Sequence, residues 1–183
     1  MGIFYYKMAN IFFASDHHFH HENILTFKRG DGSPLRVFQD ANHMNEHMVS
    51  QHNNRVRPGD KVYFLGDVTM HRSAKSLEIL SRMNGEKVLI KGNHDLCKAE
   101  QYLRYFKDVR AYHQFQGIIL SHIPIHLGCL SRWKINVHGH LHANVVELQL
   151  SQLPDTRYIN VSMEQLDNYT PISLEEIKKK AGI

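Results

Sequence analysis

The amino-acid sequence predicts a single-domain α/β protein with mixed β-sheets. Short apolar runs alternate with segments of helical periodicity over most of the chain, and two further strand-like runs follow close together near its end. Strand-helix alternation is typical of parallel pairing, and closely spaced strands are typical of antiparallel pairing. A chain of 183 residues is long enough for one domain with its own hydrophobic core.

The predicted strands share one pattern, a short apolar run that ends in polar or glycine residues. This pattern is typical of buried strands. The runs cover residues 10–14, 61–65, 87–90, 117–120 and 134–137. Two more strands are predicted at residues 143–150 and 156–161, with a turn at residues 153–155.

Helices are predicted in the gaps between the strands. Apolar residues at helical spacing indicate helices at residues 40–56, 73–83 and 100–106. Ser173 and Glu176 form a capping box, which predicts that the last helix begins there.

The composition describes a globular protein, with 42% hydrophobic and 22% charged residues. The formal net charge of +4 is too small to indicate nucleic-acid binding by itself. No apolar run approaches the roughly 18 residues of a membrane span, and residues 1–10 are a poor match to a secretory signal. Cys97 and Cys129 match neither a disulfide framework nor a zinc ribbon. We therefore expect a cytoplasmic protein without a membrane partner.

The 15 histidines are unevenly spread and indicate a metal site. They cluster at residues 17–21 and 138–142, directly after predicted strands. In α/β sheets, loops beyond the strand ends converge on binding sites. Oxygen and imidazole donors follow every one of the early strands: Asp16, His18, Asp67, Asn93, His122, His140 and His142. This donor set suits manganese, iron or zinc, and it is large enough for two ions that share a carboxylate.

These blocks resemble the signature of the calcineurin-like metallophosphoesterase family. The blocks are residues 16–18, 66–67, 92–95, 122 and 139–142, in the order of the family's motifs. Residues 120–124 also look like the small bacterial and phage members. The resemblance implies an αββα four-layer sandwich of two mixed β-sheets over residues 1–183, with the metal ions at one edge.

The resemblance also implies a role for each residue. Asp16, His18 and His142 would hold one ion, Asn93, His122 and His140 the other, and Asp67 would bridge them. Two divalent transition-metal ions are expected, manganese first, with iron, zinc or nickel as alternatives. Two such ions can activate a shared water as a bridging hydroxide that attacks phosphorus in line.

His94 follows the ligand Asn93 and is expected to act as the general acid that protonates the leaving oxygen. Many family members carry an acidic residue three positions after the bridging aspartate, and it orients this histidine. Here that position is Met70, so the orientation of His94 is open. Asp95 is adjacent in sequence as an alternative partner.

Substrate contacts are expected from residues that flank the ligand blocks. His20 and His21 either line the pocket or lie on a surface loop. Arg29 and Arg36 lie in a basic segment that either attracts an anionic substrate or is a solvated surface. Arg132 is a candidate phosphate clamp.

The predicted function is hydrolysis of phosphodiester bonds of nucleotide or nucleic-acid type, with single-stranded nucleic acid among the candidate partners. A phosphomonoesterase of the same fold is the alternative within this class. A non-catalytic metal-binding scaffold is an alternative of a different class. The sequence leaves the natural substrate, the native metal and the oligomeric state open.

Overall fold

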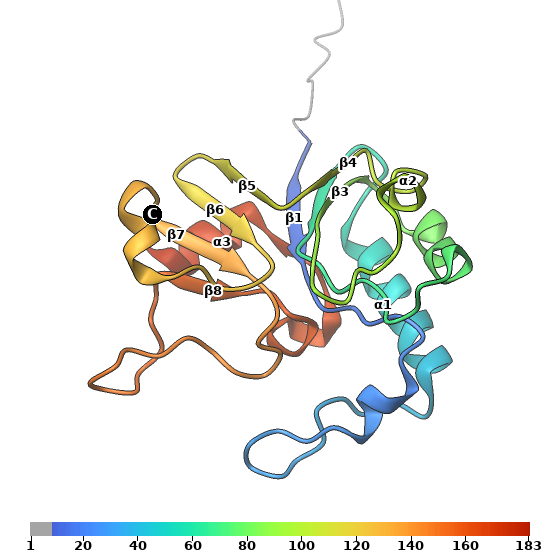
Figure 1. Cartoon of the computed structure of the whole chain (residues 1–183), viewed down its shortest axis with the longest axis horizontal. Coiled ribbons are helices and arrows are strands. Elements are labelled where there is room, and N and C mark those ends of the chain that lie inside the picture. The colour runs from blue at the N-terminus through green and yellow to red at the C-terminus, as the bar shows by residue number, and fades with distance from the viewer. Residues whose placement is uncertain (1–8) are drawn as a thin grey trace, which may run out of the picture.

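Apolar strands from two β-sheets face each other in residues 9–183, the part of the chain that the computed structural model describes (Figure 1). The first sheet has the order β4-β3-β2-β1-β9 and is parallel except for β9, which runs antiparallel to β1. Its strands are β1 (Ile11–Ala14), β2 (Lys61–Phe64), β3 (Glu86–Ile90), β4 (Asp108–Arg110) and β9 (Ile172–Ser173).

The second sheet has the order β5-β6-β7-β8 and is also mixed, because β5 is antiparallel to β6 whereas the other pairs are parallel. Its strands are β5 (Tyr112–Phe115), β6 (Ile118–Ser121), β7 (Ile135–His138) and β8 (Tyr158–Asn160). Two mixed sheets confirm the predicted fold class.

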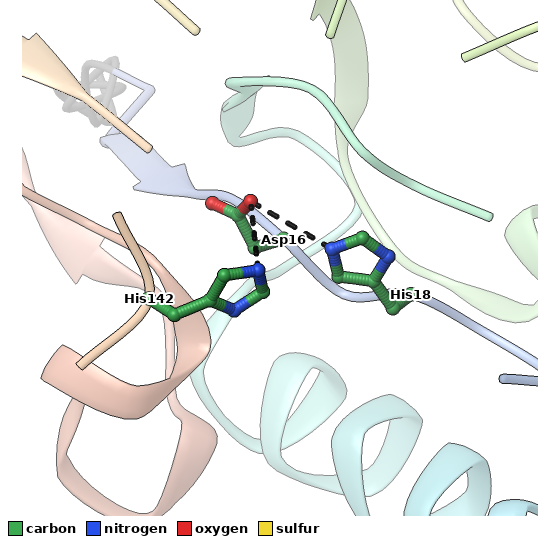
Figure 2. Close-up of side chains that lie close together, drawn as sticks. All are labelled: Asp16, His18 and His142. Carbon is green, nitrogen blue, oxygen red and sulfur yellow. Dashed lines mark ion pairs between the residues drawn. The ribbon is translucent and has the colours of Figure 1, made fainter. Parts of the chain in front are cut away.

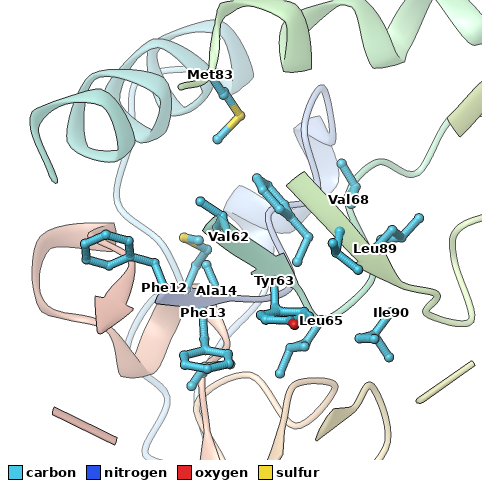
Figure 3. Close-up of a cluster of buried hydrophobic side chains, with 14 of the residues drawn as sticks. Phe12, Phe13, Ala14, Val62, Tyr63, Leu65, Val68, Met83, Leu89 and Ile90 are labelled. Carbon is cyan, nitrogen blue, oxygen red and sulfur yellow. The ribbon is translucent and has the colours of Figure 1, made fainter. Parts of the chain in front are cut away.

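Aromatic rings join the two sheets into one core. Phe13 of β1 stacks on Tyr63 of β2, with ring centroids 5.7 Å apart, and on Phe115 of β5 at 6.3 Å. Figure 3 shows the apolar side chains around Phe13 and Tyr63. Burying such rings stabilises the sandwich through removed apolar surface and favourable ring contacts.

Helices complete the outer layers. The α-helices are α1 (Ala41–Arg55), α2 (Ala99–Tyr102) and α3 (Leu174–Ala181). The 3₁₀-helices are η1 (Glu22–Thr26), η2 (Ala74–Arg82), η3 (Leu127–Arg132), η4 (Met163–Gln165) and η5 (Asp167–Tyr169). In Figure 1, α1 and α2 lie beyond the first sheet, and α3 lies beside the second. None of these helices is long and apolar enough to cross a bilayer.

Local sequence signals explain two of the α-helices. Asp40 accepts a hydrogen bond from the backbone N–H of His43 at 2.7 Å and starts α1, whose Met44 and Met48 are buried as the spacing predicts. The predicted capping box of Ser173 and Glu176 starts α3.

Several predicted elements differ from the observed ones. Within the helix predicted at residues 73–83, Ala74–Arg82 form the 3₁₀-helix η2 rather than an α-helix, with i to i+3 bonds such as Met83 N–H to the Leu80 carbonyl. The predicted strand at residues 143–150 is wrong. Its backbone hydrogen bonds go to residues 152–155 in a protruding loop instead of to the free edge of β8. The expectation about residues 1–10 falls mostly on residues 1–8, which lie outside the described part.

Asp60 supports the edge where β1 and β2 begin. Its carboxylate accepts hydrogen bonds from the backbone N–H groups of Asn10 and Arg57, both at 2.9 Å. Burial raises the pKa of Asp60, but these hydrogen bonds outweigh burial, so its pKa is lowered in the folded protein. A lowered folded-state pKa stabilises the protein above the unfolded value of about 3.9, and this contribution is lost as the pH falls through the folded value.

We therefore expect Asp60→Asn to lower the free energy of unfolding at pH 7 by about 1–2 kcal/mol, because an amide offers one acceptor oxygen instead of two. The difference from wild type should shrink below about pH 4, where the wild-type carboxylate also becomes protonated. Urea unfolding at pH 7 and pH 3.5 measures both values. The exposed Asp167→Asn variant is the control, and a difference that stays constant with pH would contradict this role.

Candidate metal centre

The strand ends of both sheets converge on one cluster of histidines and carboxylates. Asp16 follows β1, Asp67 follows β2, His122 follows β6 and His140 follows β7. The backbone joins the first two loops, since Asp16 N–H donates to the Gly66 carbonyl at 3.0 Å. The carboxyl ends of parallel strands meet at the same edge of a sheet, which explains why residues far apart in sequence meet here.

One group of potential metal ligands consists of Asp16, His18 and His142 (Figure 2). Asp16 Oδ1 lies 3.8 Å from His18 Nε2 and 4.0 Å from His142 Nε2. Within residues 9–183, Asp16 Oδ1 and both nitrogens of His18 are buried and have no hydrogen-bond partner. Buried polar atoms without partners are costly, and a cation between them would satisfy Asp16 Oδ1 and one His18 nitrogen.

A second group consists of Asp67, His122 and His140. Asp67 Oδ2 lies 3.3 Å from His122 Nε2 and 3.7 Å from His18 Nε2, so this one oxygen faces both groups. Asn93 joins the second group through its Oδ1, which is 3.0 Å from His122 Nε2. The geometry therefore gives two adjacent donor sets with Asp67 between them.

The backbone is strained at most of these ligands. Positive φ angles, where L-residues are disfavoured, occur at Asp16 (58°), His18 (51°), Asp67 (53°), His140 (69°) and His142 (50°). Each such residue costs of order 1–3 kcal/mol, and this kind of strain concentrates at functional sites. Here it turns each side chain from the strand end toward the cluster.

Glycines make room for the carboxylates. A Cβ added to Gly92 would overlap Asp67 Oδ1, and a Cβ added to Gly139 would overlap Ser15 Oγ and Asp16 Oδ2. The glycines next to the ligand positions therefore allow a close approach that any side chain would block.

Two histidines of the cluster differ in their protonation. Burial lowers the pKa of His18 to about 2, and the positive charge of Arg36 acts in the same direction, so His18 is neutral with a free lone pair. Burial also lowers the pKa of His122, but its hydrogen bond to Asp67 and the charges of Asp16 and Asp67 outweigh burial and raise it to about 9. The His122 Nδ1–H donates to the Leu65 carbonyl at 2.7 Å, which turns Nε2 toward Asp67. Cation binding therefore releases the Nε2 proton.

Comparison with known proteins places the chain among relatives without an assigned activity. It is 35% identical over 175 residues to the uncharacterized protein MJ1445 of Methanocaldococcus jannaschii, an alignment that covers 94% of this chain and 92% of the relative. The chain belongs to the family of MJ1445. A search of protein-family models finds no match.

A solved structure is also similar in fold to nearly the whole of this chain. It is the crystal structure of the protein of unknown function AQ665 from Aquifex aeolicus, with a TM-score of 0.67 and 26% sequence identity. The similarity extends over 94% of this chain and 99% of that one. The fold of this chain is therefore similar to that of AQ665 over nearly the whole length of both chains.

In this member of the MJ1445 family, His94 lies at the rim of the ligand cluster. Its backbone N–H donates to Asp67 Oδ1 at 2.8 Å, and its half-buried ring has its centroid 5.7 Å from that of His18. Asp95 does not orient the His94 ring, because its carboxylate accepts the backbone N–H groups of Asp67, Val68 and Gly92. No side chain in residues 9–183 forms a hydrogen bond with the His94 ring.

Of the residues expected to contact substrate, some lie at the ligand cluster and others lie away from it. The His21 ring centroid lies 5.7 Å from that of His18, at the cluster. His20 turns away toward Asn45, 3.0 Å from its Nδ1, and lines a groove of about 640 Å³ between α1 and η2. Arg132 is exposed at the end of η3, and Arg29 is half-buried in the loop after η1.

The expectation that Arg36 lies on a substrate-attracting rim is wrong. The residue is 1% exposed, and its guanidinium is engaged by protein acceptors. Nη1 donates to the His17 carbonyl at 2.8 Å, and Nη2 donates to the Asp16 carbonyl at 2.5 Å. Arg36 therefore supports the loop that carries two ligands and is not available to substrate.

Two residues of the cluster were missed in the sequence. Glu164 in η4 accepts hydrogen bonds from Arg36 and His142, and Ser162 Oγ donates to Asp16 Oδ2 at 2.9 Å. Both follow the short strand β8, which carries no recognisable ligand motif. Their one sequence signal is their position directly after a predicted strand, at residues 156–161.

Proposed function

We propose that the protein is a metal-dependent phosphoesterase of the calcineurin-like type, which hydrolyses phosphodiester bonds with two divalent transition-metal ions. The observation that carries the proposal is the pair of Asp/His groups on either side of Asp67, with His94 at their rim. Two cations at such a site lower the pKa of a water, polarise the phosphoryl oxygens and so favour in-line attack. For these mixed imidazole and carboxylate donors we place manganese first, with iron, zinc or nickel as alternatives.

The residues of the chain would divide the work. Asp16, His18 and His142 would hold one ion, Asn93, His122 and His140 would hold the other, and Asp67 would contact both. The His94 ring, free of protein hydrogen bonds within residues 9–183, donates its proton to the leaving oxygen. His21, beside His18, contacts the substrate from the other side of the cluster.

The engagement of Arg36 removes one group that could have bound a phosphate monoester. A phosphate monoester dianion has an additional negative charge to neutralise, and arginine is the usual group for that purpose. The Arg36 guanidinium is already bound to Glu164 and to backbone carbonyls, so it is not free for this role. Nucleotide or nucleic-acid diesters are the proposed class, with a phosphomonoesterase as the second candidate. The free thiols Cys97 and Cys129 fit a reducing compartment, and we infer a cytoplasmic location.

Metal analysis and turnover test the proposal together. The purified protein should bind close to two transition-metal ions per chain, and chelation followed by added manganese should abolish and then restore activity. The substrate panel contains a nitrophenyl phosphodiester, a nitrophenyl phosphomonoester, cyclic nucleotides, dinucleotides and single-stranded nucleic acid. Within this panel, the protein should hydrolyse the diesters faster than the monoester. Full activity with one ion would contradict the two-metal site. Two bound ions without turnover of any ester would favour the non-catalytic scaffold.

A further inference from the structure

A buried ion pair lies directly beneath the first ligand group. Arg36 Nε donates to Glu164 Oε1 at 2.7 Å, and both side chains are 0% exposed. Arg36 comes from the loop between η1 and α1, and Glu164 comes from η4, so the pair joins segments that are 128 residues apart. Removing two charges from water is costly, and an apolar pair of similar volume is often at least as stable. Stability of the fold therefore does not explain why a charged pair lies here.

Both members of the pair also contact metal-ligand residues. The same Glu164 Oε1 accepts a hydrogen bond from His142 Nδ1 at 3.1 Å. On the other side, the Arg36 guanidinium binds the carbonyls of Asp16 and His17. The pair thus holds the His142 ring, from the loop after β7, and the backbone at Asp16, after β1. These two residues come from different sheets and belong to the same ligand group.

The hydrogen bond to Glu164 determines which nitrogen of His142 can serve as a ligand. When Nδ1 donates its proton to the carboxylate, the lone pair of the neutral ring is on Nε2, which faces Asp16 Oδ1. A carboxylate behind a ligating histidine also increases the basicity of the ring. The second ligand group has other supports, namely the Leu65 carbonyl behind His122 and the Asp95 carboxylate behind the Asp67 backbone.

We propose that Glu164 is a positioning residue that, held by Arg36, selectively sets the affinity of the ion bound by Asp16, His18 and His142. The inference rests on the metal-binding part of the proposed function and is independent of the hydrolytic part. Loss of a carboxylate behind a ligating histidine typically lowers metal affinity about 10–100-fold. The effect should fall on one ion of the pair, because Glu164 contacts a ligand of the first group alone.

Titration of the full chain with manganese, measured by calorimetry, tests the proposed role of Glu164. Glu164→Gln should weaken one of the two binding events about 10–100-fold and leave the other within about twofold of wild type. It should resemble His142→Ala and differ from His140→Ala, which removes a ligand of the second group. Glu46→Gln is the matched control, because Glu46 also pairs with an arginine, Arg82, but is 48% exposed. The control should bind both ions as wild type does.

A second variant and a wild-type measurement cover the case in which Glu164→Gln does not fold. The double variant Arg36→Met with Glu164→Leu removes both charges, and it should also lose affinity for one ion. In the zinc-loaded wild-type protein, the ¹⁵N spectrum of His142 should show a proton on Nδ1. A proton on Nε2, unchanged affinities in a folded variant or equal weakening of both ions would each overturn the inference. Wild-type protein that binds no metal would instead overturn the proposed function itself.

Discussion

Asp67→Asn is expected to abolish the binding of a second ion and to lower the rate of phosphodiester hydrolysis by about 10²–10³-fold. Asp67 Oδ2 faces His18 Nε2 at 3.7 Å and His122 Nε2 at 3.3 Å, so this oxygen is placed to contact a cation in either group. A neutral amide cannot offset the repulsion between two nearby cations. A loss of about 3–4 kcal/mol of charge stabilisation corresponds to that fall in rate.

The comparison with His142→Ala makes this test specific. His142 belongs to one ligand group, so its removal should cost less activity than Asp67→Asn and should leave the other ion bound. Metal content by atomic absorption and initial rates on a nitrophenyl phosphodiester give both readouts. Asp31→Asn, in an exposed loop, is the control and should match wild type. Normal metal content and rate in Asp67→Asn would mean that Asp67 does not bridge.

His94→Ala is expected to separate metal binding from catalysis. The His94 ring lies beside the ligand groups but belongs to neither, so both ions should remain bound. Proton donation to the leaving oxygen should be lost. An alkyl or ribose oxygen leaves poorly as an anion, so hydrolysis of such esters should slow by about 10²–10⁴-fold. A nitrophenolate leaves readily without a proton, so its release should slow much less.

The contrast between the two leaving groups distinguishes the possible roles of His94. A folding defect would slow both substrates alike and lower the melting temperature, whereas the exposed His43→Ala control should change neither. Equal slowing with both ions in place would mean that His94 positions the phosphoryl group. Loss of metal from the variant would mean that His94 is a ligand. Equal slowing of both substrates would fit the absence of an orienting acid, since Met70 is at that position and the Asp95 carboxylate accepts backbone N–H groups.

Sequence patterns predicted the strands that lie inside the sheets and the edge strand β8, but not the edge strands β4, β5 and β9. The central strands β1, β2, β3, β6 and β7 are apolar on both faces, because each is covered on both sides. Edge strands are half-exposed and contain polar residues such as those of β4 and β5, or are as short as β9. Residues 143–150 have the composition of a strand, but their backbone hydrogen bonds go to residues 152–155 of the same loop and not to the edge of a sheet.

The candidate ligands could be identified from the sequence because their residue types and positions are local properties. Each ligand directly follows a buried strand, and the carboxyl ends of parallel strands converge in any fold of this class. The sequence also placed His94 beside the ligand Asn93. What it could not determine was which of the neighbouring histidines and arginines turn toward the cluster.

The tertiary structure alone determined the supports of the site. Arg36 has the sequence context of an exposed basic loop, and Glu164 has no motif, yet they form a buried pair across 128 residues. The left-handed backbone at Asp16 and Asp67 likewise depends on hydrogen bonds from distant segments. The sequence by itself therefore determined the residue types that could bind a metal and the strand ends that carry them. Their orientation was decided by long-range packing, because a side chain's direction depends on contacts that have no fixed spacing along the chain.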